Sequence, residues 1–112
     1  MSVLVACGGE GKAAESYLRK LADAEPWERT FLIAETKPEG SWTHIPIRDE
    51  MLLGDMAEAI KTALDGKVPD TEVALNMVVG PGKVHMAALA AILKCGLGVH
   101  LVALTPEGMK EL

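Results

Sequence analysis

The chain has 112 residues, which is enough for one domain and too few for a second domain with its own core. Hydrophobic residues make up 49% and charged residues 24% of the sequence, a globular balance that excludes disordered, collagen-like and coiled-coil chains. The formal net charge of -5 disfavours non-specific binding to duplex nucleic acid through a basic face.

The apolar stretches and the cysteines predict where the protein works. The longest uncharged apolar stretch, residues 84–93, has roughly half the length of a bilayer span, and the N-terminus lacks the basic start of a secretory signal. We therefore expect a cytoplasmic protein without membrane contact. Cys7 and Cys95 lack the paired spacing of a zinc site, so we expect reduced core thiols, no metal and no cofactor.

The first predicted elements alternate strand and helix. Residues 3–7 are an uninterrupted apolar run before a Gly-Gly pair, the pattern of a strand buried on both faces. From Lys12 the apolar residues follow a helical spacing, which predicts an amphipathic helix that closes before the next proline. Residues 30–34 are a second buried strand. Residues 42–47 form a short strand that Pro46 restricts to a sheet edge or a strand end.

The second half continues this alternation. Asp49 is the expected N-cap of a helix that stops at Gly66. Residues 73–79 are a long apolar strand, residues 84–95 a helix almost free of polar residues, and residues 99–104 the last strand, ended by a proline.

This order predicts one small doubly wound, Rossmann-like α/β domain over residues 1–112, with a mainly parallel sheet and helices on both faces. In such sheets, ligands bind beyond the carboxyl ends of the strands where the strand order reverses. Two glycine loops have that position, residues 8–12 and residues 80–83. If their strands are neighbours, the two loops share one crevice.

Neither loop matches the established phosphate motifs. A P-loop requires Ser or Thr after its Gly-Lys pair, whereas Ala13 and Val84 stand there. The dinucleotide fingerprint fails because Ala14 occupies its third glycine position, and no arginine follows Cys7 as a phosphatase loop requires. From these residues alone, Cys7 is expected to be a packing residue.

A simpler anion site remains at the second loop. Backbone amides at a helix N-terminus bind anions, and Lys83 in the first turn can meet a phosphate directly. The alternative is that Gly80 and Gly82 only make a turn and that Lys83 is solvated. His85 points either into the crevice or under the helix, and Glu10 is a weak candidate because its charge repels phosphate unless it accepts a ribose hydroxyl.

The helix at residues 84–95 is apolar around its circumference, so one face covers the sheet and the opposite face needs another cover. A homodimer interface or a neighbouring helix would supply it.

The segment 75–88 resembles the signature of CRISPR-associated Rossmann-fold (CARF) domains. In that family an Asn or Asp on a strand, here Asn76, precedes a glycine-rich loop with a lysine, here Lys83, and a Met and small residues open the next helix. Residues 45–49 are similar to the family's middle segment, and residues 6–9 occupy its first-strand loop.

The resemblance implies a homodimer whose two crevices form one pocket for cyclic oligoadenylate, with cyclic tetra-adenylate the favoured ring. A stand-alone domain of this kind resembles a ring nuclease of type III CRISPR defence, which cleaves the ring without metal through attack of a ribose 2′-hydroxyl. Lys83 and His85 are the implied catalytic residues. The implied ligand-binding residues are Cys7, Gly8, Gly9, Glu10, Asn76, Gly80, Pro81, Gly82 and Lys83.

Three other readings stay open at this point. The first is a cyclic oligoadenylate sensor that binds without cleaving. The second is a small Rossmann-like module for a mononucleotide or another phosphorylated ligand. The third is a structural subunit whose helix around residues 86–93 docks on a larger partner.

Overall fold

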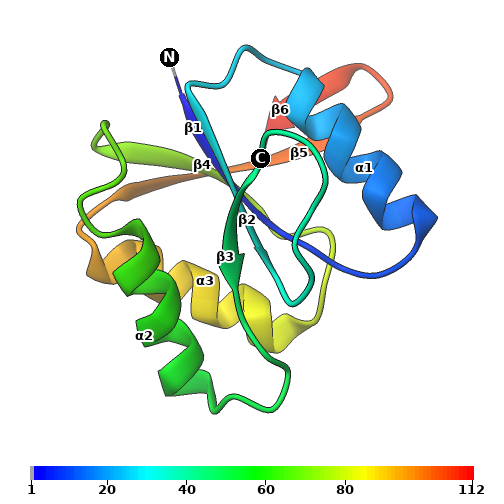
Figure 1. The fold of residues 1–112 in the computed structure, drawn as a ribbon. Helices are drawn as coiled ribbons and strands as arrows, with labels where there is room; N and C mark the ends of the chain where they lie inside the picture. Colours follow the sequence, from blue (N-terminus) through cyan, green and yellow to red (C-terminus); the bar gives the residue numbers. More distant parts are fainter. Residues whose placement is uncertain (1) are drawn as a thin grey trace.

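The computed structural model describes residues 2–112, which fold into a six-stranded sheet with three helices (Figure 1). The α/β class expected from the alternating pattern is confirmed. In chain order the elements are β1 (Val3–Cys7), α1 (Lys12–Asp23), β2 (Arg29–Ala34), β3 (Thr43–Pro46), α2 (Leu53–Leu64), β4 (Glu72–Asn76), α3 (Gly82–Lys94), β5 (Gly98–Thr105) and β6 (Gly108–Glu111).

The sheet has the order β3-β2-β1-β4-β5-β6, so the strand order reverses between β1 and β4. β1 to β5 pair in parallel, and β6 pairs antiparallel with β5. Helix α1 lies on one face of the sheet, whereas α2 and α3 lie on the other (Figure 1). This is the expected doubly wound arrangement, because right-handed crossovers on the two sides of the reversal place helices on opposite faces.

Both faces of the sheet are packed, and β1 contributes to both. All five of its residues are buried, with Val3 and Val5 in the core under α2 and α3. Leu4 and Ala6 lie in the smaller core under α1, where Leu18 packs. The uninterrupted apolar run at residues 3–7 is therefore explained by burial on two sides.

The structure corrects two predicted boundaries. β4 ends at Asn76 rather than at Val79, because the Asn76 Oδ1 accepts the Val78 N–H at 3.3 Å and turns the chain out of the sheet. Asp49 is not the N-cap of α2, which begins at Leu53 after Leu52. The Asp49 N–H instead donates to the Glu35 Oε1 at 2.7 Å, so this residue belongs to the loop before the helix.

Strand β6 was not predicted from the sequence. It follows a tight turn in which the Thr105 Oγ1 donates to the Gly108 carbonyl at 2.8 Å and Gly108 has a φ of +106°. A Pro-Glu-Gly turn after an apolar strand is a hairpin signal. The strand itself is short and mostly exposed, so it lacks the apolar alternation that identifies a strand in a sequence.

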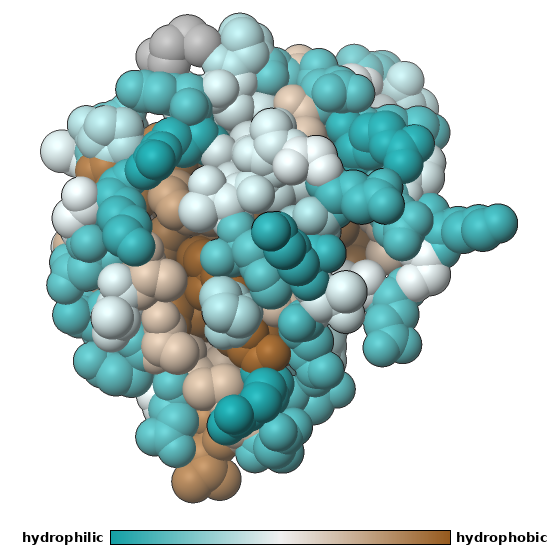
Figure 2. All heavy atoms as spheres, viewed as in Figure 1, coloured by the Kyte–Doolittle hydropathy of each residue, from teal (hydrophilic) through white to brown (hydrophobic). Residues whose placement is uncertain are grey.

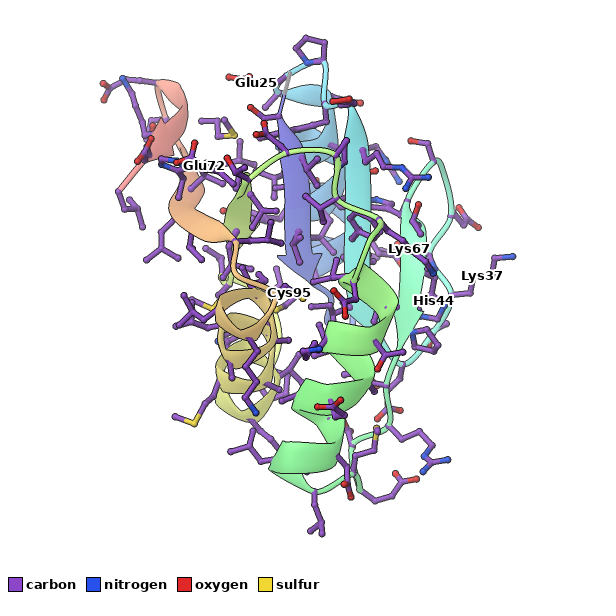
Figure 3. All side chains as sticks on the ribbon, turned by 90° about the vertical axis from the view of Figure 1, so that its left-hand side faces the viewer. Glu25, Lys37, His44, Lys67, Glu72 and Cys95 are labelled. Carbon is purple, nitrogen blue, oxygen red and sulfur yellow. The ribbon has the colours of Figure 1, made fainter. Side chains whose placement is uncertain are left out.

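Helix α3 is covered on two sides. Its buried residues face the sheet, and α2 packs along one flank, so the neighbouring helix supplies part of the expected second cover (Figure 3). An apolar strip remains open on α3, with Met86 62% and Leu93 58% exposed and Leu89 and Ala90 partly buried between them. None of the helices described over residues 2–112 is long and apolar enough to cross a bilayer.

Candidate functional site

The two glycine loops touch each other at the carboxyl edge of the sheet. Gly80 has a φ of +93°, and a Cβ on it would lie 2.6 Å from the Gly8 carbonyl oxygen. A Cβ on Gly9 would lie 2.5 Å from the Val79 Cγ1. Only glycine allows these backbones to approach so closely. The expected adjacency of the loops is correct, because β1 and β4 are paired neighbours.

Two helices begin at this edge without a side-chain cap. Gly11 precedes α1 and Pro81 precedes α3, and neither position carries a side-chain hydrogen bond to the first turn. The first amides of an α-helix have no partner inside the helix. Both helix N-termini therefore offer backbone donors and a partial positive charge beside the glycine loops.

Lys83 reaches away from its own loop. Its Nζ donates to the Asp49 carbonyl at 2.8 Å and so links the start of α3 to the loop between β3 and α2. The side chain is exposed. An anion at the glycine loops would therefore compete with the Asp49 carbonyl for the Lys83 ammonium.

His85 is tied to the loop before its helix. Its Nε2 lies 2.8 Å from the Val79 carbonyl. Because a carbonyl only accepts hydrogen bonds, Nε2 carries the proton, and Nδ1 is the basic nitrogen of the neutral ring. His85 thus holds the chain between β4 and α3 and keeps one nitrogen for other contacts.

Two of the nine implied ligand-binding residues have buried side chains. The Cys7 side chain is fully buried, and this burial raises the pKa of its thiol to about 12, so Cys7 is a neutral packing residue as its sequence context alone suggested. Asn76 is fully buried as well, and its Nδ2 donates to the Tyr17 hydroxyl at 3.0 Å and to the Val102 carbonyl at 2.9 Å. Asn76 therefore lies beneath the second glycine loop and holds its shape through hydrogen bonds in the core.

The Tyr17 hydroxyl completes this buried network. Strand β5 extends past the end of β4, so its backbone groups on that side lack a strand partner. Asn76 satisfies the Val102 carbonyl, and the Tyr17 hydroxyl accepts the Leu104 N–H at 3.1 Å. In the sequence, Tyr17 is only one of the residues at helical spacing in the predicted amphipathic helix that starts at Lys12. The pairing joins α1, β4 and β5 directly below the glycine loops.

Carboxylates also lie at this edge, and sequence reasoning missed two of them. The Glu35 Oε1 accepts the Asp49 N–H at 2.7 Å, and the hydrogen bond between the two carboxyl groups raises the pKa of Glu35. Their positions directly after β2 and after β3 were the available signal. Glu10 is exposed in the first loop. Over residues 2–112, the structure places no group of three or more His, Cys, Asp or Glu side chains where they could hold a metal ion.

Exposed apolar side chains belong to the same edge. Leu52 is 74% and Val78 58% exposed, and they lie at the start of α2 and between β4 and α3. Figure 2 shows apolar side chains gathered over the helices on this side of the sheet, including one at the lower tip of the molecule. Uncharged surface of this kind fits a nucleobase or a second protein surface.

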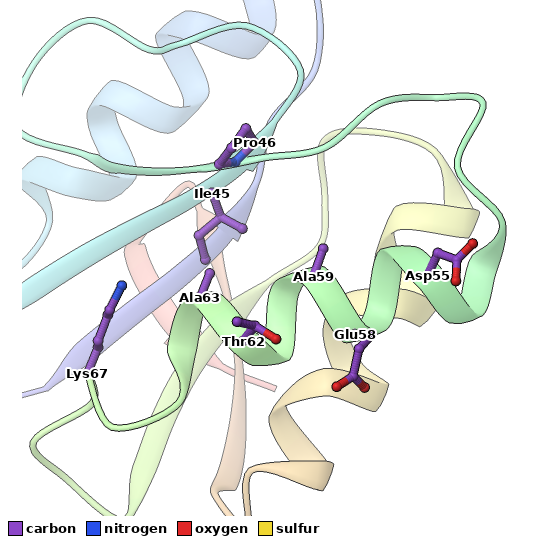
Figure 4. A pocket seen from close by; sticks show the side chains of 8 residues that line it. All are labelled: Ile45, Pro46, Asp55, Glu58, Ala59, Thr62, Ala63 and Lys67. Carbon is purple, nitrogen blue, oxygen red and sulfur yellow. The ribbon is translucent and has the colours of Figure 1, made fainter.

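A groove of about 550 Å³ lies elsewhere, between edge strand β3 and α2 (Figure 4). Ile45 and Pro46 form one side, and α2 contributes small side chains. Asp55 and Glu58 also line it. The two carboxylates outnumber Lys67, the one cation in the lining of this groove, so the charges there disfavour a phosphate. No residue of either glycine loop lines the groove, and the glycine-loop edge is therefore the better candidate for an anion site.

No protein-family model, curated protein or solved structure matches this chain. The resemblance to CARF domains therefore stays a prediction, and the Rossmann-like α/β fold is what the structure establishes.

Proposed function

We propose that the protein binds cyclic oligoadenylate at the joined glycine loops of a homodimer and cleaves it without a metal ion. The observation that carries this proposal is the close approach of Gly80 to the Gly8 carbonyl, which brings the two glycine loops together. This surface lies at the reversal of strand order, between the N-termini of α1 and α3. Cyclic tetra-adenylate is the ring that we favour.

Phosphodiester groups suit this surface. Glycine leaves room for a phosphate to approach the backbone, and the uncapped first turns of α1 and α3 supply N–H donors and favourable dipoles. Lys83 adds a full positive charge when its ammonium leaves the Asp49 carbonyl. The exposed apolar side chains of Leu52 and Val78 would cover adenine bases.

Cleavage would proceed inside the ligand. A ribose 2′-oxygen bonds to the adjacent phosphorus while the bond from phosphorus to the 5′-oxygen breaks, leaving a 2′,3′-cyclic phosphate and a 5′-hydroxyl. The Nδ1 of His85 is the candidate acceptor of the 2′-hydroxyl proton, and the 5′-oxygen takes up a proton as it leaves. Lys83 and the amides of Gly9 and Gly82 would stabilise the charge on the phosphorane oxygens. The Gly8 N–H, which the sequence also suggested for this role, is already donated to the Ile33 carbonyl at 2.8 Å.

A homodimer fits both the ligand and the open strip on α3. A ring with two-fold symmetry matches an isologous interface. Met86 and Leu93 are large, apolar and exposed, and a second copy of the chain would remove them from water. Because α3 also begins at the glycine loops, this contact would bring the two crevices together.

The direct test incubates the purified protein with cyclic tetra- and hexa-adenylate in excess EDTA, separates the products, and measures affinity by calorimetry. Lys83→Ala is expected to weaken binding by about 1 to 3 kcal/mol, the worth of a charged hydrogen bond, and to slow cleavage further. Lys12→Ala is the matched control, because Lys12 lies past the first glycine turn. Loss of cleavage on chelation with rescue by manganese, or Lys12→Ala damaging binding while Lys83→Ala does not, would contradict the assignment.

Binding without cleavage is the second candidate function. It is favoured by the hydrogen bond that holds the His85 ring to the Val79 carbonyl, since a side chain that fixes the loop has less freedom to move a proton. A sensor would bind the ring in the same calorimetric assay and return it intact.

A further inference from the structure

His100 lies between two carboxylates at the opposite end of the sheet. Its Nε2 is 3.1 Å from the Glu72 Oε2, and its Nδ1 is 2.8 Å from the Glu111 Oε2. The three residues belong to the neighbouring strands β4, β5 and β6. Figure 3 shows Glu72 and Glu25 at the end of the sheet away from the start of α2.

Both contacts need a protonated ring. An ionised carboxylate only accepts hydrogen bonds, and a neutral imidazole has one N–H to donate. The two short contacts are therefore satisfied together only when both ring nitrogens carry protons and His100 is a cation.

The surroundings favour that cation. A hollow of about 380 Å³ is lined by His100 and by four carboxylates, those of Glu25, Asp70, Glu72 and Glu111. They come from the loop before β2, the loop before β4, β4 itself and β6. Among the described residues that line this hollow there is no lysine or arginine. Within residues 2–112, every charged group in the lining of this hollow other than His100 is thus negative.

We propose that His100 is a proton-operated clasp that holds the C-terminal strand β6 on the sheet. β6 is a short edge strand, joined to the sheet through β5 alone, and most of its residues are exposed. The protonated ring ties Glu111 of β6 to Glu72 of β4 across β5. When His100 loses its proton, one of the two bonds is lost and the four carboxylates face each other without a cation, so β6 loosens.

The hydrogen bonds to Glu111 and to Glu72, in that order, raise the pKa of His100 above its ordinary value. A histidine whose pKa is raised by folding stabilises the folded protein fully below its unfolded pKa. That stabilisation is lost as the pH rises through the folded pKa. The link from Glu111 through His100 to Glu72 is therefore formed in mildly acidic solution and is weakened toward alkaline pH.

The test is an NMR titration of the full chain together with amide hydrogen exchange. We expect His100 to titrate above the ordinary histidine pKa, because its ring contacts two carboxylates. His44 is the comparison residue for the variants, because its ring contacts the Ala34 carbonyl at 2.8 Å rather than a carboxylate. From about pH 5.5 to about pH 8.5, the protection factors of the β6 amides should fall roughly two- to fivefold, the range of exposed ion pairs. The amides of β1 are the internal reference and should not change.

Variants separate the clasp from general pH effects. His100→Gln keeps a hydrogen-bond donor but cannot titrate, so it should abolish the pH dependence of β6 protection, whereas His44→Gln should leave it intact. Glu111→Gln should move the pKa of His100 toward its ordinary value. The proposal is overturned if His100 titrates at or below the ordinary histidine pKa, or if β6 protection stays constant while His100 titrates. No ligand enters these measurements, so they are independent of the proposed function.

Discussion

Replacing Tyr17 with phenylalanine isolates the buried network below the glycine loops. The ring stays in the core under α1, and only the hydroxyl is lost. That oxygen accepts a hydrogen bond from the Asn76 Nδ2 at 3.0 Å and from the Leu104 N–H at 3.1 Å. The change therefore leaves the Leu104 N–H and one of the two N–H bonds of the Asn76 amide without an acceptor, while the other stays bonded to the Val102 carbonyl. An unsatisfied buried donor costs about 1 to 3 kcal/mol, and because Tyr17 is half-buried we expect the lower end, about 2 kcal/mol in total.

This cost converts into a measurable shift. The entropy of unfolding is roughly 0.24 kcal/mol/K for a chain of 112 residues, so about 2 kcal/mol lowers the Tm by about 8 °C. Thermal and urea unfolding followed by circular dichroism give both values. Thr105→Val is the matched control, since its hydroxyl lies in an exposed turn and its loss should change stability by less than about 0.5 kcal/mol. If Tyr17→Phe costs as little as this control, the network does not support the loop.

Three further predictions concern the loops and the α3 strip. In urea unfolding, Gly80→Ala should destabilise the protein by at least about 1 kcal/mol more than Gly11→Ala. Both glycines have a positive φ, but only at Gly80 would the new Cβ clash, because it would lie 2.6 Å from the Gly8 carbonyl oxygen. Equal losses of stability in the two variants would refute the close contact. Cys7 should resist alkylation by iodoacetamide at neutral pH in the folded protein and react on unfolding, since its thiol is buried with a pKa of about 12; prompt labelling of the native protein would contradict this. Met86→Lys should shift the mass measured by light scattering from that of a dimer to that of a monomer without loss of folding, because Met86 is exposed in a single copy of the chain. A wild-type protein that is monomeric at micromolar concentration would refute the predicted homodimer.

The sheet could be predicted from the sequence because its strands carry a strong signal. Buried parallel strands are unbroken apolar runs, and residues 3–7 and 30–34 lie within a residue of the observed strands. Burial on both faces also explains why the helices were expected on both sides. The neighbouring positions of β1 and β4, on which the shared crevice depends, follow from the reversal of strand order in doubly wound sheets.

The errors arose where side chains bond to the backbone. Asn76 ends β4 by accepting the Val78 N–H, although the next three residues are as apolar as the strand. Asp49 is a residue type that often caps helices, but here its backbone N–H donates to Glu35 and its backbone carbonyl accepts from Lys83. Such contacts join residues far apart in the chain, so periodicity and local preference do not reveal them.

The direction of the Lys83 side chain was also not predictable from the sequence, because its hydrogen-bond partner is distant in the chain. A lysine in the first turn of a helix is expected near the anion site that this turn creates. Its acceptor is the carbonyl of a loop 34 residues earlier in the chain, and only the packing of α3 beside α2 brings the two together. The sequence could place Lys83 at the correct edge but could not supply this partner.

The two ends of the sheet differ in charge, and this difference bears on the proposed binding of an anion by an acidic protein. At the end near His100, four carboxylates line one hollow and repel anions. At the glycine-loop edge, the carboxylates of Glu10, Glu35, Asp49 and Glu50 are largely offset by the exposed cations Lys12, Arg48 and Lys83, of which Arg48 pairs with Glu50 at 3.2 Å. With the formal charges there nearly cancelled, the N-terminal dipoles of α1 and α3 determine the local sign, and they point their positive ends at the loops. The proposed anionic ligand would therefore meet less repulsion at the glycine-loop edge than at the opposite end of the sheet, despite a net charge of -5.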